Sequence, residues 1–339
     1  MRNFKDNSGM VLIFTLWVLG VLTILAVAMA AGIRQKIFLV ERLDERSRMD
    51  YLLQAAVKKA AGYTHWQMEE SAFEFTPALK ANLFNNASEL SKIKLGRDMA
   101  GIGYLSSPGD DASLHWGVVD EEGKINLNRV DEPTLINLLS NVLSLNDQDA
   151  TKLARSLLDW RLNGESEPAG FYSEDYYSNL QYPYPKKNAY YETLDELLLV
   201  KGLNKEIYDK LIPYVTIYGS GAVNINTASK EVLEALGMKD TLIEKIMAVR
   251  RGKDEREGTG DDRIFSKPFE IVAELNAFIA LTLEETRAID TLNMRKFLGT
   301  HSSYFTIEAA GKLAGRSNSK SVCAVYAARE DKIVYWKER

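Results

Sequence analysis

Cysteine and histidine are scarce in this chain. Its 339 residues include one cysteine, Cys323, so neither an intrachain disulfide nor a cysteine-based zinc site can form. The three histidines, His65, His115 and His301, are far apart in the sequence and show no metal-ligand spacing. The chain also has no Gly-x-Ser-x-Gly elbow, no phosphate-binding glycine loop and no HExxH motif. We therefore do not expect an enzyme.

The chain also has no excess of positive charge. The formal net charge is −5, and the isoelectric point is near 5.5. A folded surface with this charge repels nucleic acid on average, so we expect no nucleic-acid partner. The length suggests two domains with additional segments, because a domain usually has about 100–200 residues. With 46% hydrophobic residues, the chain can bury a sizeable core.

Charged side chains are absent between Met10 and Ile33. These 24 residues would form a helix about 36 Å long at 1.5 Å per residue. The hydrocarbon core of a bilayer is about 30 Å thick, so the segment 10–33 can span it as a transmembrane helix. Arg2 and Lys5 precede the segment, and positive charge on the short leading side favours a cytoplasmic location for that end. We therefore expect a single-pass protein of the inner membrane with the bulk of its chain in the periplasm.

Proline is missing up to Pro77. From Arg34 to Gln67 apolar residues recur at spacings of three and four, which predicts an amphipathic continuation of the same helix. They are Ile37, Val40, Leu43, Leu52, Leu53, Ala56, Val57, Ala60 and Ala61. The sequence thus predicts one long helix that is apolar first and amphipathic afterwards.

A cleaved secretory signal peptide is the alternative interpretation of the N-terminus. Ala26-Val27-Ala28 and Ala28-Met29-Ala30 both offer small-x-small cleavage sites after an apolar run. The mature chain would then be a secreted, soluble binding protein. The helical periodicity runs straight through these sites, which favours the retained anchor.

Strand-like segments lie on both sides of a long helical block. Alternating or β-rich segments occur at 101–105 and 115–119, and again at 305–309, 322–326 and 333–336. We predict an α+β fold in which the long N-terminal helix packs on a small antiparallel, pilin-like sheet, with an inserted all-α domain. The expected bounds are 34–127 for the first part of the sheet domain, 128–292 for the insertion and 293–339 for the C-terminal strands.

The helical block contains an internal repeat. Ile125-Asn126-Leu127-Asn128 and Val223-Asn224-Ile225-Asn226 each lead into an apolar helix, and a second helix ending in arginine follows, at 154–161 and 243–251. A third unit spans 193–214. All three units resemble helix-hairpin-helix modules.

This resemblance leaves a DNA-binding module on a pilus-like membrane anchor, used in competence-type uptake, as an alternative function. Such modules hold phosphate with the backbone N–H groups of a glycine-rich turn and with nearby Lys or Arg. In this chain Asp147 and Asp240 stand in those turns, and the Gly-Ile-Gly sequence is missing. We therefore favour a protein–protein role for these helices.

Acidic residues after the first repeat offer a calcium hypothesis, because calcium takes six to eight oxygen ligands. The candidate ligands are Asp159, Glu165, Glu167, Glu174 and Asp175, with Asn163 between them. A second acidic segment contains Asp254, Glu255, Glu257, Asp261 and Asp262. The alternative for each segment is a solvated loop without an ion.

Tyrosine is concentrated in the segment 171–191. The aromatic residues there are Phe171, Tyr172, Tyr176, Tyr177, Tyr182, Tyr184, Tyr190 and Tyr191. Tyrosine and proline together suit an ordered surface loop or a protein interface, and burial in the core is the alternative.

The residues Asn7-Ser8-Gly9-Met10, between a short charged leader and the unbroken apolar helix, resemble the prepilin peptidase site of type IV pilins and pseudopilins. The resemblance implies that residues 1–9 are a leader, that cleavage follows Gly9, and that Met10 becomes an N-methylated terminus. The fifth residue from Met10 is Phe14, where most pilins have a glutamate that neutralises the terminal amine of a neighbouring subunit in lipid. A tip subunit has no amine above it, and GspK-type pseudopilins lack this glutamate.

Further motifs extend this resemblance over nearly the whole chain. In order, they are GKINLN, LLDWR, the tyrosine-rich segment, LDELLLVKGL, PYVTIY, VNINTASKEVLEAL and SSYF. This order resembles the GspK family, which implies a minor pseudopilin that caps and helps initiate the pseudopilus of a type II secretion system for folded proteins. It also implies a hetero-oligomeric tip complex with other minor pseudopilins, above the major pseudopilin. Asn163 and Ala169-Gly170-Phe171 depart from the aspartate-rich family pattern, which weakens the calcium hypothesis.

Overall fold

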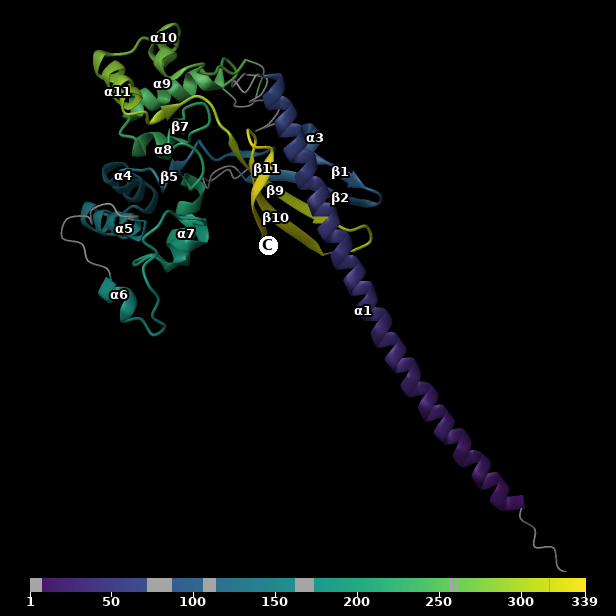
Figure 1. Cartoon of the computed structure of the whole chain (residues 1–339). Helices are drawn as coiled ribbons and strands as arrows, with labels where there is room; N and C mark the ends of the chain where they lie inside the picture. Colours follow the sequence, from purple (N-terminus) through teal and green to yellow (C-terminus); the bar gives the residue numbers. More distant parts are fainter. Residues whose placement is uncertain are drawn as a thin grey trace, which may run out of the picture.

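One helix dominates the molecule. The computed structural model describes residues 8–71, 87–105, 114–161, 174–255, 259, 261–316 and 318–339. Helix α1 runs from Ser8 to Glu70 without interruption, so its 63 residues extend about 95 Å at 1.5 Å per residue. Figure 1 shows its N-terminal half leaving the rest of the molecule as a bare rod. The predicted long helix is confirmed.

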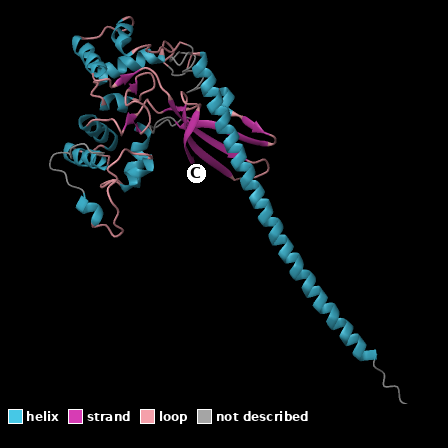
Figure 2. Ribbon diagram, in the orientation of Figure 1, coloured by secondary structure: helices cyan, strands magenta, loops and turns pink. Residues whose placement is uncertain are grey.

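An antiparallel sheet lies against the C-terminal half of α1, as Figure 2 shows. Its main strands follow the order β1-β2-β9-β10-β11, with β3 paired to β2 and β4 paired to β9. The strands are β1 Ile93–Leu95, β2 Asp98–Leu105, β3 Leu114–Trp116, β4 Val119–Asp120, β9 Tyr304–Lys312, β10 Ser319–Ala327 and β11 Lys332–Glu338. Because β2 pairs with β9 across about two hundred residues of chain, the strands before and after the helical block form one sheet, as predicted.

Helix α1 and the sheet share a hydrophobic core. Leu52, Leu53 and Ala56 of α1 are buried against Phe305 and Ile307 of β9 and their neighbours. The approach is close at Gly311, where an added Cβ would lie 3.1 Å from both Leu52 and Leu53. The amphipathic pattern after residue 34 therefore becomes a packing face only from Met49 onwards.

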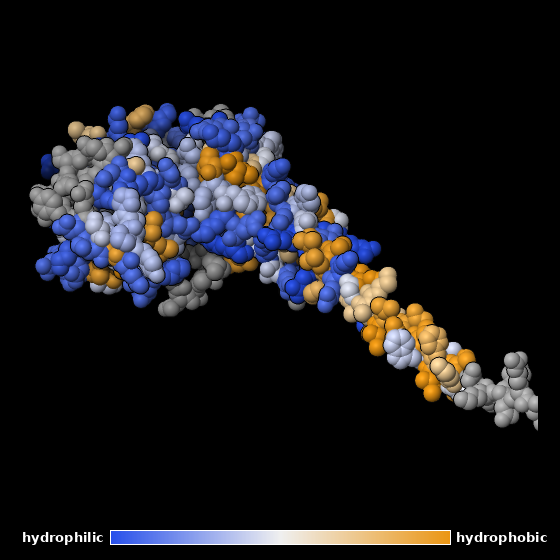
Figure 3. Space-filling model, turned by 60° about the horizontal axis from the view of Figure 1, so that its bottom comes forward, coloured by the Kyte–Doolittle hydropathy of each residue, from blue (hydrophilic) through white to orange (hydrophobic). Residues whose placement is uncertain are grey.

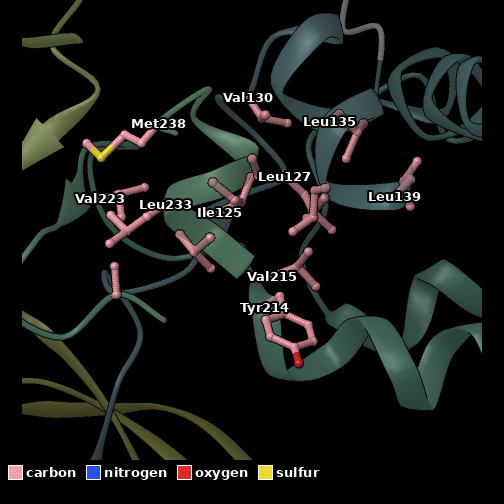
Figure 4. Close-up of a cluster of buried hydrophobic side chains, with 14 of the residues drawn as sticks. Ile125, Leu127, Val130, Leu135, Leu139, Tyr214, Val215, Val223, Leu233 and Met238 are labelled. Atoms are coloured by element: carbon pink, nitrogen blue, oxygen red, sulfur yellow. The ribbon is translucent and has the colours of Figure 1, made fainter. Parts of the chain in front are cut away.

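The helical block surrounds a second core. Its α-helices are α4 Glu132–Leu143, α5 Asp147–Trp160, α6 Glu174–Ser178, α7 Lys205–Leu211, α8 Lys230–Ala235, α9 Asp240–Arg251, α10 Ile271–Asn276 and α11 Leu283–Met294, and α3 Ser88–Ser91 belongs to the sheet side. Three 3-10 helices, η2 Leu194–Leu199, η3 Ile212–Tyr214 and η4 Pro268–Glu270, connect them. Figure 4 shows Ile125, Leu127, Leu139, Val223 and Leu233 converging in this core.

Two short parallel ladders, each joining the helical block to a strand just outside its expected bounds, were not predicted. Strand β5 Ile125–Asn126 pairs with β6 Val215–Thr216, and β7 Val223–Asn224 pairs with β8 Leu298–Gly299. The first helix of the predicted third unit is the 3-10 helix η2 rather than an α-helix. The α+β class with a helical insertion is confirmed, whereas the bounds 128–292 stay a prediction.

Candidate assembly surface and joint

The N-terminal half of α1 is an uncovered apolar surface. Among the residues that the structure describes, this is the one helix long and apolar enough to cross a membrane, and no residue of its most apolar window is buried. Figure 3 shows the apolar side chains as a continuous rod. Thr15 and Thr23 donate their hydroxyl hydrogens to the carbonyls of Leu12 and Gly20, so both hydroxyls are satisfied within the helix.

The predicted processing residues lie in the first turns of this helix. Gly9 and Met10 belong to α1, and Met10 and Phe14 are 77% and 66% exposed. Residues 1–7 of the predicted leader lie outside the described residues. The structure thus places the predicted mature terminus at the outer end of the rod.

Apolar exposure continues beyond the predicted membrane segment. Ile37, Phe38, Val40 and Leu43 are exposed on α1 before its buried face begins at Met49. The Arg42 guanidinium lies 4.3 Å from the centre of the Phe38 ring, so charge and apolar surface alternate here. We call residues 34–48 the stem.

A buried polar joint connects the sheet to the helical domain. At its centre the Asp120 carboxylate accepts hydrogen bonds from Asn224 Nδ2 at 2.9 Å, Thr227 Oγ1 at 2.5 Å and Ser302 Oγ at 2.6 Å. The backbone N–H of Glu122 adds a fourth at 2.8 Å. Asp120 belongs to the sheet through β4, whereas Asn224 belongs to the helical domain through β7.

The next two acids extend the joint. Glu121 Oε1 accepts from Thr306 Oγ1 of the sheet at 2.7 Å, and its Oε2 accepts from Thr216 Oγ1 of the helical domain at 2.6 Å. The Glu122 carboxylate accepts from the backbone N–H groups of Ser303 and Ser220. Each acid therefore holds groups from both domains, and a buried acceptor with several donors specifies one arrangement.

Burial sets the proton affinity of two joint acids. Removal from water raises the pKa of Asp120, although its four hydrogen bonds act in the opposite direction. The pKa of Glu122 is raised mainly by burial and then by the negative charge of Asp120. Since both folded pKa values lie above the unfolded ones, these groups favour the folded state most at low pH and lose that contribution as pH rises through the folded pKa.

The internal repeat gives Asn126 and Asn224 the same backbone hydrogen bonds. The carbonyl of Asn126 accepts from the N–H groups of Arg129 and Val130, and the carbonyl of Asn224 accepts from those of Thr227 and Ala228. In both repeats the asparagine side-chain oxygen also accepts from the backbone N–H two residues later. The repeat is therefore a structural one, with a parallel ladder at the start of each unit.

An arginine at or next to the end of each second helix, Arg161 or Arg250, has structural partners, whereas Arg251, the predicted last residue of the second of these helices, is exposed. Arg161 donates to the carbonyls of Leu127 and Val130 at 2.8 Å and 2.6 Å, and the buried Arg250 donates to the carbonyl of Ala228 at 2.6 Å. Both guanidinium groups thus tie the second helix of a unit to its first turn. They are engaged inside the protein and are not presented to a phosphate.

The turns of the predicted hairpins contain the acidic residues Asp147 and Asp240. Asp240, at the start of α9, lies 3.0 Å from Lys230 Nζ, which lowers the pKa of Asp240 through a hydrogen bond and the positive charge. Asp147 is exposed in the first turn of α5. Both turns therefore carry a carboxylate at the position where duplex DNA would bring its phosphates.

Of the predicted calcium ligands, the structure describes the side chains of Asp159 and Asp175. Asp159 is fully buried in α5, and its Oδ1 lies 2.7 Å from Lys186 Nζ. Asp175 is exposed on α6. The side chain of Glu174 lies outside the part of the chain that the structure describes, and so do the residues Asn163, Glu165, Glu167 and Glu257. Among the described residues no group of three or more His, Cys, Asp or Glu could hold a metal ion. A cation at this place stays a prediction, and the carboxylate of Asp159 already has a cationic partner.

The tyrosine-rich segment has a buried and an exposed part. Tyr177 and Tyr191 are buried, whereas Tyr176, Tyr182 and Tyr190 are exposed. Phe171 and Tyr172 lie outside the described residues. Both interpretations of the segment, core and surface, therefore apply to different members.

The joint was not predicted from the sequence. The residues 120–123 have the composition of a polar turn, and nothing local indicates that Asp120, Glu121 and Glu122 are all buried. One usable signal was present, because Asn126 and Asn224 occupy the same position in the two repeats. An asparagine kept by both repeats points to a shared hydrogen-bonding role.

Comparison with known proteins places these features in a context. Residues 120–220, which contain the three joint acids and the first repeat, match the family model for type II secretion system protein K. The chain is 24% identical over 307 residues to the type II secretion system protein K of Aeromonas hydrophila, covering 82% of this chain and 86% of that protein. Its fold is similar to a chain in the crystal structure of the GspK-GspI-GspJ complex from enterotoxigenic Escherichia coli, with a TM-score of 0.66, 15% identity and coverage of 88% and 99% of the two chains.

Proposed function

We propose that this chain, a member of the type II secretion system protein K family, is the minor pseudopilin that caps the pseudopilus of its system and helps to initiate it. The observation that carries the proposal is one uncovered apolar helix fixed through a buried joint to a large helical domain. Apolar helices in a bilayer associate by packing, so the helix can join a bundle of similar helices. The helical domain occupies the opposite end of the molecule, where a further subunit would have to stack.

Filament labelling tests the capping role. Gold-coupled antibody against the helical domain should mark only the ends of pseudopili prepared from a strain that makes this chain. Label along the filament sides would contradict a cap. A strain without the chain should lose export of folded proteins and regain it when the chain is supplied.

We also propose a place in the cell and a processing step. The apolar helix would anchor the chain in the inner membrane, with both folded domains in the periplasm, since Arg2 and Lys5 favour a cytoplasmic leading end. Cleavage would follow Gly9, and Met10 would be methylated. Mass analysis of the N-terminal peptide distinguishes this from signal-peptide cleavage, because a Met10 start and an Ala31 start lie 21 residues apart.

The proposed partners are two other minor pseudopilins and the major pseudopilin. Support comes from the similar solved chain, which was crystallised in a GspK-GspI-GspJ complex. The uncovered stem and anchor offer the contact surface. Cysteine crosslinking at exposed stem positions, such as Leu39→Cys, should trap partner pseudopilins in membranes, whereas a cysteine at an exposed position of α7 should not.

The proposed division into domains matches the two cores except at Ile125, Leu127 and Leu298, which belong to the core of the helical block although they lie outside 128–292. Residues 34–127 with 293–339 would form the pilin-like domain, and 128–292 would form the insertion. We infer an assembly role without catalysis, and we propose no nucleic-acid function because Arg161, Arg250 and Asp240 all have internal partners.

A further inference from the structure

A lysine ammonium stands where the sequence predicted a bound cation. Asp159 lies in the last turn of α5 with a fully buried side chain, and Lys186 Nζ lies 2.7 Å from its Oδ1. The Lys186 side chain is only 3% exposed, although it comes from a segment of irregular structure. A charge that has left water needs a compensating charge beside it, and each of these two supplies it for the other.

Aromatic rings lie near the ion pair. The Trp160 ring is 5.5 Å from that of Tyr177, and the Tyr177 ring is 5.6 Å from that of Tyr184. Burial raises the pKa of Tyr177 to about 12, and the nearby Asp159 charge adds to the effect. Tyr191 donates its hydroxyl hydrogen to the carbonyl of Leu157, two residues before Asp159. In so dry a place the attraction between opposite charges is strong.

We propose that Lys186 is the built-in counter-cation of Asp159, which takes the place of a divalent ion and ties the tyrosine-rich segment to α5. Calcium would need several oxygen ligands around it, whereas among the described residues no group of three or more His, Cys, Asp or Glu could hold a metal, and the Asp159 carboxylate lies 2.7 Å from an ammonium group. The helical domain therefore holds this segment without an external ion. Its stability is independent of chelators.

Thermal denaturation of the full chain in detergent tests the proposal. The wild type should melt at the same temperature in excess EDTA and in calcium chloride. Lys186→Met should lower Tm by at least about 5 °C, because removing one partner leaves a buried charge alone. Adding Asp159→Leu to Lys186→Met should restore most of the loss. Lys205→Met is the control, since the ion pair of Lys205 with Asp209 is exposed and its loss should hardly change Tm.

Three outcomes would overturn the proposal. One is a wild-type Tm that falls in EDTA and recovers with calcium. Another is a Lys186→Met variant that melts like the wild type. The third is a double variant that is no more stable than Lys186→Met alone. If Lys186→Met does not fold, the double variant still decides. Its folding would support the pairing of Asp159 with Lys186, and its failure to fold would contradict it.

Discussion

Three consecutive acids at the joint show how single residues fix the relation between two domains. Asp120, Glu121 and Glu122 are buried, and the donors they hold come from segments about one hundred and two hundred residues further along the chain. A hydrogen bond gains little net free energy, whereas an unpaired buried donor is costly. These acids therefore act mainly by making every other domain arrangement unfavourable.

The first prediction concerns Asp120→Ala. It removes the shared acceptor of Asn224, Thr227 and Ser302, of which Asn224 keeps Ser302 Oγ at 2.8 Å and Thr227 keeps only a carbonyl at 3.5 Å. We therefore expect a loss of about 3 kcal/mol in the free energy of unfolding. Urea denaturation followed by tryptophan fluorescence measures it. Asp209→Ala is the control, because its exposed pair with Lys205 should contribute less than about 1 kcal/mol. Equal stability of the two variants would contradict the proposed role of the joint.

The second prediction concerns Phe14. Phe14→Glu places a carboxylate near the start of the apolar rod, where an unpaired charge is costly, although less so than the about 2.5–3.5 kcal/mol that it costs at the bilayer centre. If no terminal amine lies above this subunit, the charge stays unpaired, and less of the variant should co-purify with partner pseudopilins from membranes. Phe14→Leu should co-purify like the wild type. Undiminished recovery of Phe14→Glu would indicate a neighbouring amine and argue against the tip position.

Among the elements, α11 offers a pH-dependent prediction. Its capping residue Glu285 accepts from Lys245 Nζ at 2.7 Å and from the Thr282 N–H at 2.7 Å, which lower the pKa of Glu285 from 4.5 to about 2. The ionised form is thus favoured in the folded state, so its stabilisation is present above about pH 4.5 and disappears as pH falls toward 2. Glu285→Gln should therefore be less stable than the wild type at pH 7, with a difference that shrinks on acidification.

Glu284→Gln is the matched control for this prediction. Its neighbour Lys239 and Glu284 itself are both largely exposed, so their pair should matter little at any pH. A difference between wild type and Glu285→Gln that stays constant down to pH 3 would contradict the assigned cause of the pKa shift.

Elements with long periodic patterns could be predicted from the sequence, and short ones could not. Helix α1 and the strands β2, β9, β10 and β11 span enough residues for an apolar period to be visible. The parallel ladders β5–β6 and β7–β8 have two residues a strand, too few to show any period. The terminal arginines were recognised as a repeated feature, but their carbonyl partners depend on how two helices cross, which periodicity does not encode.

For the whole molecule, the joint marks the limit of sequence-based prediction. A turn-like acidic sequence acquires its role only when distant segments supply donors, such as Ser302, which is 182 residues from Asp120. The anchor, in contrast, follows from composition alone, because a bilayer selects for length and apolarity. A feature can thus be predicted from the sequence when neighbouring residues determine it. The relative placement of the domains depends on contacts between distant segments and therefore cannot be predicted in this way.

The last prediction tests whether this placement matters for export. Gly219 has φ +84°, and an added Cβ would lie 2.5 Å from Glu122 Cγ, whereas Gly237 has φ +86° and open space around it. Gly219→Val and Gly237→Val therefore carry similar backbone strain, but only the first forces the joint apart. Spin-label distances between β11 and α9 should broaden in Gly219→Val alone, and that variant should restore secretion poorly in a strain lacking the chain. A cap must hold its bulky domain in one direction to block the stacking of a further subunit. Normal secretion by Gly219→Val, despite a broadened distance distribution, would therefore show that this blocking does not require a rigid joint.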